Sequence, residues 1–435
     1  MRTIRASASR LDRQHWFLLA VLGAASFFQG YDLNLVAVAL PQLRHTFGLT
    51  QSQASFWVSL LFLGALPAVF LTRQADRRGR RAILLISICG YTIATGLTAL
   101  APSILVFAIC QFFARGFLGT ETAVVWTMVA EEMPAASRGF GFGWLAMMAA
   151  LGTGASAILY GPVGLSWRVL YALSLPPLLG VALLRRRLPE SRRFAQARQS
   201  GVLAEKWRQI LQPPNRRWLI LLCVTAVLGA LTTHAATLAP DFLQTQRGVS
   251  RSTLGLLVVG AGAPAVLVLL TAGALSDRFG RKVVGCSFAG LAVIGALLLF
   301  FVARSTAALF GAIAITLTGT LGARPALGAF SSELFPTPLR ALGGSAVSIA
   351  VVLGEVLSLG LGGILLRILG DLPDVVAILV LGPIGVIIMV ARFFPETKGR
   401  ELEEIHQSVD RGIPIGMIGG PADVLGPPVF PIPDM

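Results

Sequence analysis

The hexapeptide DRRGRR at residues 76–81 returns as DRFGRK at residues 277–282, an offset of 201 residues. A second element, E-x-x-P-x-x-x-R, runs from Glu131 to Arg138 and returns from Glu333 to Arg340, an offset of 202 residues. Chance rarely places two different polar motifs at one spacing in an apolar chain. These repeats predict that the chain consists of one unit duplicated in parallel.

A third repeat marks the end of each unit. Pro-Glu-Ser at 189–191 follows the last apolar stretch of the first half, and Pro-Glu-Thr at 395–397 follows that of the second. We therefore predict an N-terminal bundle over 1–184, a basic cytoplasmic linker over 185–217, a C-terminal bundle over 218–394 and a tail over 395–435. The end of the tail is rich in Pro and Gly, a composition typical of disorder.

The composition is that of a membrane protein. Hydrophobic residues make up 55% of the chain and charged residues 13%, whereas a soluble domain has about 25% charged residues. A membrane helix needs about 20 apolar residues, and such stretches recur along the chain. We predict an all-α membrane protein with twelve transmembrane helices in two six-helix bundles. The predicted spans are 16–40, 54–71, 82–101, 103–130, 139–161, 167–184, 218–240, 253–275, 283–303, 305–332, 341–366 and 375–394.

The net charge of +15 would suit a nucleic-acid partner, but the distribution of the charges argues against one. With these spans, most Lys and Arg fall on one side of the bilayer. The positive-inside rule then places both termini in the cytoplasm of a multi-pass inner-membrane (plasma-membrane) protein. The opposite side carries Arg44, Arg168, Arg247, Arg251, Arg304 and Arg367.

The sequence contains no pattern that predicts an enzyme. Its four cysteines lie in apolar stretches without metal-ligand spacing, so we interpret them as small buried side chains. A nucleotide-binding loop and a nucleophile motif are also missing from the sequence. We therefore expect neither a metal nor another cofactor.

Together, the D-R-x-G-R-[RK] and E-x-x-P-x-x-x-R elements, LPESRRF at 188–194 and FPETKG at 394–399 resemble the major facilitator superfamily. The resemblance covers residues 15–405 and is greatest to the sugar-porter and the metabolite and organic-ion proton symporter branches. It implies a monomer in the lipid bilayer that alternately exposes a midplane substrate site between its halves. Its partners would be a small-molecule substrate and protons.

In that family the loop motifs are gating elements. Carboxylates and guanidinium groups at adjacent helix ends can pair in one conformation and separate in the other. The alternative is that these charges only anchor the helices and set the topology. The predicted gating residues are Asp76, Arg77, Gly79, Arg80, Glu131, Arg138, Glu190, Asp277, Arg278, Gly280, Arg281, Glu333, Arg340 and Glu396.

Ionisable residues inside a membrane helix are costly and mark functional sites. Asp32, in a Gly-Tyr-Asp element, resembles the proton-coupling acid of related symporters; the alternative is a static buried pair with Arg115. Glu121 matches an acid of the organic-ion symporters and is a second predicted proton-coupling residue. Glu355 is the third, with a cation ligand and a partner of Arg324 as open alternatives.

Four residues are predicted to bind substrate. The family's helix-4 arginine corresponds to Gln111, and Arg115, one turn later on the same face, is predicted to take its place. Arg324 and His234 complete the set, although a lone His inside a helix is about as often a core residue.

These residues favour an organic acid over a sugar. The positions that bind sugar in the family hold Ala146, Leu228, Gly229 and Gly328 here, whereas an arginine offers a bidentate partner for a carboxylate. We therefore predict proton-coupled symport of a small organic acid. The alternatives are proton-driven efflux of drugs or organic cations, sugar:proton symport, and a sensor built on the same fold.

Overall fold

The computed structural model describes residues 11–78, 80–134, 137–185, 209–213, 215–335 and 339–398. Within these ranges, twelve helices are long and apolar enough to cross a membrane. The predicted all-α fold with twelve spans is confirmed.

Six spans form the first bundle, the N-half. Its helices are α2 (Arg13–Val38), α3 (Leu40–Phe47), α4 (Gln51–Leu63), α5 (Ala68–Arg78), α6 (Arg80–Ala99), α7 (Ile104–Glu132), α8 (Arg138–Tyr160), α9 (Trp167–Leu173) and α10 (Leu175–Arg185). The other six spans form the C-half. Its helices are α13 (Asn215–Ala230), α14 (Thr233–Thr245), α15 (Arg251–Phe279), α16 (Arg281–Leu297) with the π-helical turn η2 (Leu298–Val302), α17 (Thr306–Glu333), α18 (Arg340–Leu369), α19 (Leu372–Leu379) and α20 (Leu381–Phe393).

Several spans that the sequence predicts as single helices are interrupted near prolines. Pro67 lies between α4 and α5, Pro176 in the first turn of α10, and Pro383 in the first turn of α20. Proline has no backbone N–H and fits the first turn of a helix better than its interior. The chain therefore starts a new helix at these points and stays within the same span.

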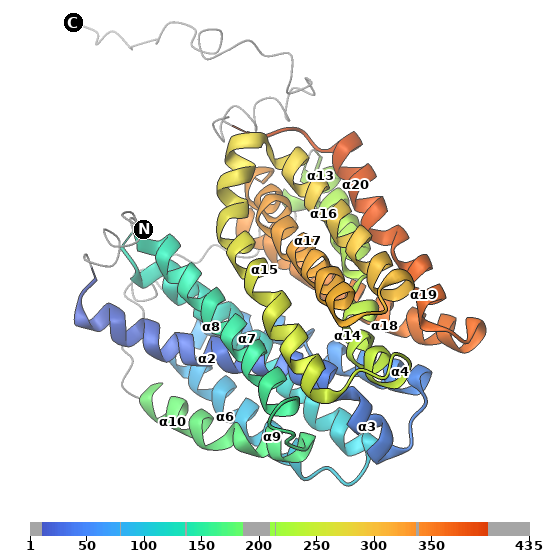
Figure 1. Cartoon of the computed structure of the whole chain (residues 1–435). Coiled ribbons are helices and arrows are strands. Elements are labelled where there is room, and N and C mark those ends of the chain that lie inside the picture. The colour runs from blue at the N-terminus through green and yellow to red at the C-terminus, as the bar shows by residue number, and fades with distance from the viewer. Residues whose placement is uncertain are drawn as a thin grey trace, which may run out of the picture.

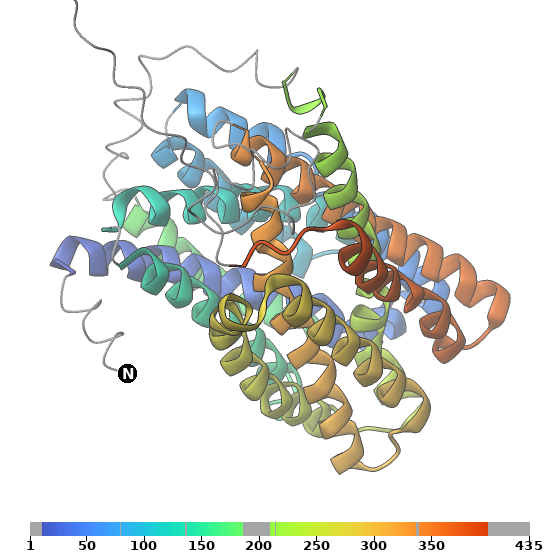
Figure 2. The same ribbon diagram turned by 90° about the horizontal axis from the view of Figure 1, so that it is seen from above.

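The two halves lie side by side. Figure 1 shows the blue-to-green helices of the N-half in one group and the lime-to-red helices of the C-half in another. In both views α2 and α20 lie on opposite sides of the molecule (Figures 1 and 2). The halves meet where α4 packs on α18, α8 on α15, and α14 on α2 and α3.

The contacts between the halves are concentrated at one end of the bundles. Ser52, Ser55 and Ser59 lie on one side of α4 and donate hydrogen bonds to the carbonyls of Gly363, Leu359 and Val356 in α18, at 2.7, 2.7 and 2.9 Å. These serine contacts lie toward the end of the bundles away from the motifs at 73–81 and 278–282.

We call the end with those motifs the basic face and the other end the opposite face. Figure 1 shows α8 and α15 close together near the opposite face and diverging toward the basic face. The two halves are thus closed against each other at the opposite face.

Candidate functional site

Asp32 lies in the C-terminal third of α2, where that helix packs tightly against α8. Gly30 allows this approach, because a Cβ at that position would overlap the backbone of Ala149. Tyr31 is held in turn by its hydroxyl, which donates to the Leu170 carbonyl at 2.9 Å. The Asp32 side chain is 1% exposed, and neither carboxylate oxygen has a hydrogen-bond partner among the described residues. A buried carboxylate without such partners is costly unless a cation or a proton compensates it.

Arg115 of α7 supplies a cation near Asp32. Its guanidinium carbon lies 4.1 Å from the centre of the Phe62 ring of α4, and its Nε and Nη2 atoms have no hydrogen-bond partner among the described residues. It interacts electrostatically with Asp32 and also with Glu355 of α18. Arg115 therefore faces the interface between the halves.

The C-half contributes two charged residues, Glu355 and Arg324, near the interface between the halves. Glu355 is partly buried and interacts electrostatically with both Arg115 and Arg324, while Arg324, on α17, is exposed. The adjacent carbonyl, that of Val356, accepts the hydrogen bond from Ser59, so Glu355 lies beside the junction of the halves. Four residues with alternating charge thus cross the interface. We call Asp32, Arg115, Glu355 and Arg324 the central charge row.

Gln111 lies one turn before Arg115 but makes a different contact. Its Nε2 donates to the Thr98 hydroxyl of α6 at 3.2 Å, and the side chain is completely buried. Arg115, and not Gln111, therefore reaches the central charge row.

Glu121 is ion-paired with Arg185, the first residue of the predicted linker. It forms a buried ion pair with Arg185, the last residue of α10, and accepts a hydrogen bond from Ser87 at 2.7 Å. Arg185 also donates to the Leu84 carbonyl at 3.2 Å. The pair ties α6, α7 and α10 together within the N-half. The signal in the sequence was the position of Arg185 directly after an apolar stretch.

His234 lies inside the C-half and not in the central charge row. Its side chain is 0% exposed and packs against Gly362 of α18. Its backbone N–H donates to the Ser358 hydroxyl at 3.1 Å, and its ring nitrogens have no hydrogen-bond partner among the described residues. In this conformation a substrate between the halves does not reach it.

The gating motif of the C-half forms one cluster at the basic face. Arg281 forms ion pairs with Asp277 and with Glu333, the latter at 3.1 Å, and the Thr397 hydroxyl donates to Glu333. Arg278 is exposed beside Phe279.

Gly280 and Glu396 form the second part of this cluster. Glu396 accepts hydrogen bonds from the backbone N–H groups of Arg281 and Lys282 at 2.8 and 3.1 Å. It therefore caps the N-terminus of α16, where anions are favoured. Gly280 has a φ of 106°, and a Cβ there would lie 2.7 Å from a Glu396 carboxylate oxygen.

The other gating predictions concern side chains that the structure leaves undescribed. Asp76, Arg77, Arg80, Glu131, Arg138 and Arg340 lie in described helices without described side chains, and Gly79 and Glu190 lie outside the described residues. They stay predictions.

An ion pair at the opposite face was not predicted from the sequence. Arg44 of α3 pairs with Asp241 of α14 at 2.5 Å, and Gln51 donates to the same Asp241 oxygen at 2.7 Å. Asp241 is 0% exposed. The predicted span ends at residue 240, whereas α14 continues to Thr245, so Asp241 fell outside the set of intramembrane charges. This cluster links the two halves where they are closed.

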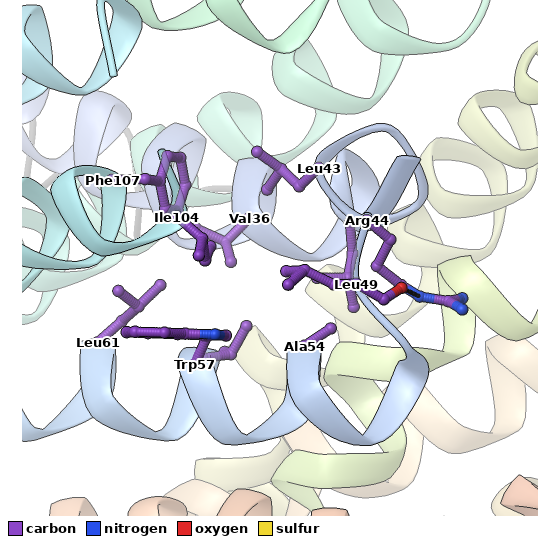
Figure 3. Close-up of a pocket in the computed structure, with 11 residues that line it drawn as sticks. Val36, Leu43, Arg44, Leu49, Ala54, Trp57, Leu61, Ile104 and Phe107 are labelled. Atoms are coloured by element: carbon purple, nitrogen blue, oxygen red, sulfur yellow. Dashed lines mark hydrogen bonds between the residues drawn. The ribbon is translucent and has the colours of Figure 1, made fainter. Parts of the chain in front are cut away.

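Arg44 also borders a small apolar cavity in the N-half (Figure 3). Its volume of about 10 Å³ is close to the minimum for one water molecule, so it does not hold a metabolite. Figure 3 shows Trp57, Leu61 and Phe107 turned toward the cavity and the Arg44 guanidinium turned away. A larger hollow of about 280 Å³ in the C-half, lined by Arg247, Arg304 and Asp374 among others, is separate from the central charge row.

Comparison with known proteins identifies the family of the chain. A family model described as "Major Facilitator Superfamily" matches residues 22–241 and, a second time, residues 220–409. The "Cis,cis-muconate transport protein" of Acinetobacter baylyi is 27% identical over 288 residues, which are 63% of this chain and 69% of that protein. The "Probable 4-methylmuconolactone transporter" of Cupriavidus pinatubonensis is 25% identical over 403 residues, 90% of this chain and 93% of that protein.

Among solved structures, the crystal structure of a D-xylose-proton symporter superposes with a TM-score of 0.72 at 18% sequence identity. The match covers 88% of this chain and 99% of the symporter. At this identity the likeness shows the fold alone.

Proposed function

The chain belongs to the Major Facilitator Superfamily, and on that basis we propose that this multi-pass membrane transporter carries out proton-coupled symport of a small organic acid. The family consists of transporters and not of enzymes, which confirms the prediction that the chain is not an enzyme. The substrate class and the coupling to protons are our proposals.

The central charge row is the observation that carries the proposal. It lies at the interface between the halves, where transporters built from two repeats bind substrate. Its two arginines, Arg115 and Arg324, come from different halves, and a guanidinium is well suited to bind a carboxylate. The two relatives compared above are named for muconate and a muconolactone, which are both organic acids.

The acids of the same row would carry the protons. Asp32 is enclosed, and among the described arginines it interacts with Arg115, so binding of a proton there changes the charge balance around Arg115. Glu121 already has Arg185 as its partner, and we therefore assign the proton to Asp32 and Glu355. Cation efflux is the weaker alternative, because Glu121 and Glu355, the acids that would bind a cation, both interact with arginines.

The membrane orientation completes the proposal. The positive-inside rule would place the basic face and both termini in the cytoplasm of the cell that has this protein in its inner membrane. The contacts at the opposite face then correspond to an inward-facing conformation of a monomer.

A flux measurement tests substrate class and coupling together. We expect purified protein in proteoliposomes to accumulate cis,cis-muconate when the outside is acidified, and not D-xylose or tetraphenylphosphonium. Asp32→Asn should abolish accumulation, because a neutral amide cannot carry the proton. Accumulation of the sugar or the cation in place of the acid would contradict the substrate class. Uptake of muconate that does not depend on the pH gradient would contradict proton coupling.

A further inference from the structure

Glu355 differs from Asp32 in its relation to the two arginines of the central charge row. Among the described arginines, Asp32 interacts with Arg115, within the N-half, whereas Glu355 interacts with Arg115 of one half and Arg324 of the other. Glu355 is thus the acid of the row whose negative charge is stabilised by arginines of both halves.

Two contacts of α4 support this arrangement independently. Ser59 donates to the carbonyl of Val356, next to Glu355, at 2.9 Å, and Phe62, three residues later on the same helix, lies against Arg115 at 4.1 Å. Residues three apart on a helix share a face. One side of α4 therefore brings Arg115 to the segment of α18 that carries Glu355.

The exposure of the two acids also differs. Asp32 is 1% exposed, whereas Glu355 is only partly buried and Arg324 is exposed. A solute that enters between the halves would meet Glu355 and Arg324, while Asp32 stays covered.

The charges of the row determine what can bind. With all four groups ionised, the two carboxylates and the two guanidinium groups balance, so an added anion would leave an uncompensated charge away from bulk water, which is unfavourable. If Glu355 takes up one proton to become a neutral carboxylic acid, the row is left with one positive charge, which one carboxylate of a ligand neutralises.

We propose that Glu355 is a resident counter-anion, which holds the place of the substrate carboxylate in the empty transporter and yields it on binding a proton. The proton comes from the same compartment as the substrate and leaves Glu355 when the substrate is released on the other side. The inference rests on the proposed function, because it takes the ligand to be an organic anion.

The helices packed against α18 supply few other groups that could produce the same pH dependence. Helix α4 supplies none, and α18 itself adds only the arginines Arg340 and Arg367. The charged or titratable groups on α13, α14, α17 and α19 are Arg216, Arg217, Cys223, His234, Asp241, Arg324, Glu333 and Asp374. His234 is enclosed against Gly362, and Asp241 is paired with Arg44 at the opposite face.

The test is the dissociation constant of cis,cis-muconate for the full-length protein, measured between about pH 6 and about pH 9, where one obligatory proton weakens binding by about tenfold per pH unit. We expect this dependence in the wild type. Glu355→Gln should bind muconate with a dissociation constant that does not change with pH. Glu355→Asp should restore the pH dependence. Asp374→Asn, an exposed acid on α19, is the matched control and should behave as the wild type.

Transport provides a second measurement. Glu355→Gln should still exchange internal for external muconate, because exchange requires no net proton movement, and this shows that the variant is folded. Wild-type binding that does not change with pH, or a dependence that persists in Glu355→Gln, would overturn the inference and leave the proposed function intact. Failure of the wild type to bind any carboxylate at any pH would instead overturn the proposed substrate class.

Discussion

Glu121 and Asp32 are both buried carboxylates in the N-half, but their partners give them different roles. Glu121 has a direct ion pair with Arg185 and a hydrogen bond from Ser87. Asp32 has no hydrogen-bond partner among the described residues and only a more distant interaction with Arg115. Since Glu121 is fixed in a direct ion pair and Asp32 is not, we infer a structural role for Glu121 and a coupling role for Asp32.

At the scale of single residues, we predict that Glu121→Gln destabilises the protein. The substitution leaves the Arg185 charge buried without a counter-ion, and breaking a buried pair in this way costs about 3–5 kcal/mol. The measurement is the thermal unfolding midpoint of the protein in detergent, with the exposed Asp374→Asn as control. Replacing both partners, with Glu121→Gln and Arg185→Met, should recover part of the loss. A single variant as stable as the wild type would show that the pair has no structural role.

At the scale of elements, the start of α16 depends on a residue from the end of the chain's last span. Glu396 caps the N-terminus of α16 through two backbone N–H groups, and Gly280 leaves room for its carboxylate. The repeated Gly of the loop motif and the repeated Glu after the last helix of each half are thus parts of one structure in the C-half. The cap links α16 to the segment after α20.

We therefore predict that Gly280→Ala weakens this cap. A φ of 106° with a ψ of 146° is unfavourable for a residue with a Cβ, by about 1–3 kcal/mol, and the new methyl group would displace Glu396 from its hydrogen bonds. The unfolding midpoint should fall and transport should decrease. Gly273→Ala is the matched control, since a Cβ there meets no atom within 4 Å. Equal effects of the two substitutions would argue against a specific role for Gly280.

At the scale of the whole molecule, the two halves are joined by side chains at the opposite face. The serines of α4 bind carbonyls of α18, and Arg44 pairs with Asp241. Transport by alternating access requires this face to open in the other half of the cycle. The contacts must therefore break and re-form in each turnover.

A disulfide across this face tests that requirement. A Cβ at Gly363 would lie 3.3 Å from the Cβ of Ser55, close to the separation of about 3.5–4.5 Å found in disulfides. With the four native cysteines replaced by serine, Ser55→Cys with Gly363→Cys should lose transport on oxidation and regain it with a reductant. Each single variant should be insensitive to both reagents. A cross-linked protein that transports at the uncross-linked rate would contradict closure of this face as a step of the cycle.

The sequence by itself determined the twelve-span fold and the family, because both depend on local properties. Apolar stretches of membrane-spanning length and polar motifs repeated at 201 and 202 residues are visible without any contact between distant residues. It also identified Asp32, Arg115, Arg324 and Glu355 as intramembrane charges, since a charge inside an apolar stretch is conspicuous in one dimension.

Only the tertiary structure decided which charges meet. Arg185 follows an apolar stretch and lies in the predicted linker, but it reaches Glu121 because α10 packs on α6. Arg44 and Asp241 are separated by 197 residues and pair only where the two halves close. Ion pairing depends on positions in space, and in a duplicated bundle each charge has several candidate partners that the one-dimensional pattern does not rank. The packing of the helices therefore distinguishes Glu121, which is in a static ion pair, from Glu355, which interacts electrostatically with arginines of both halves.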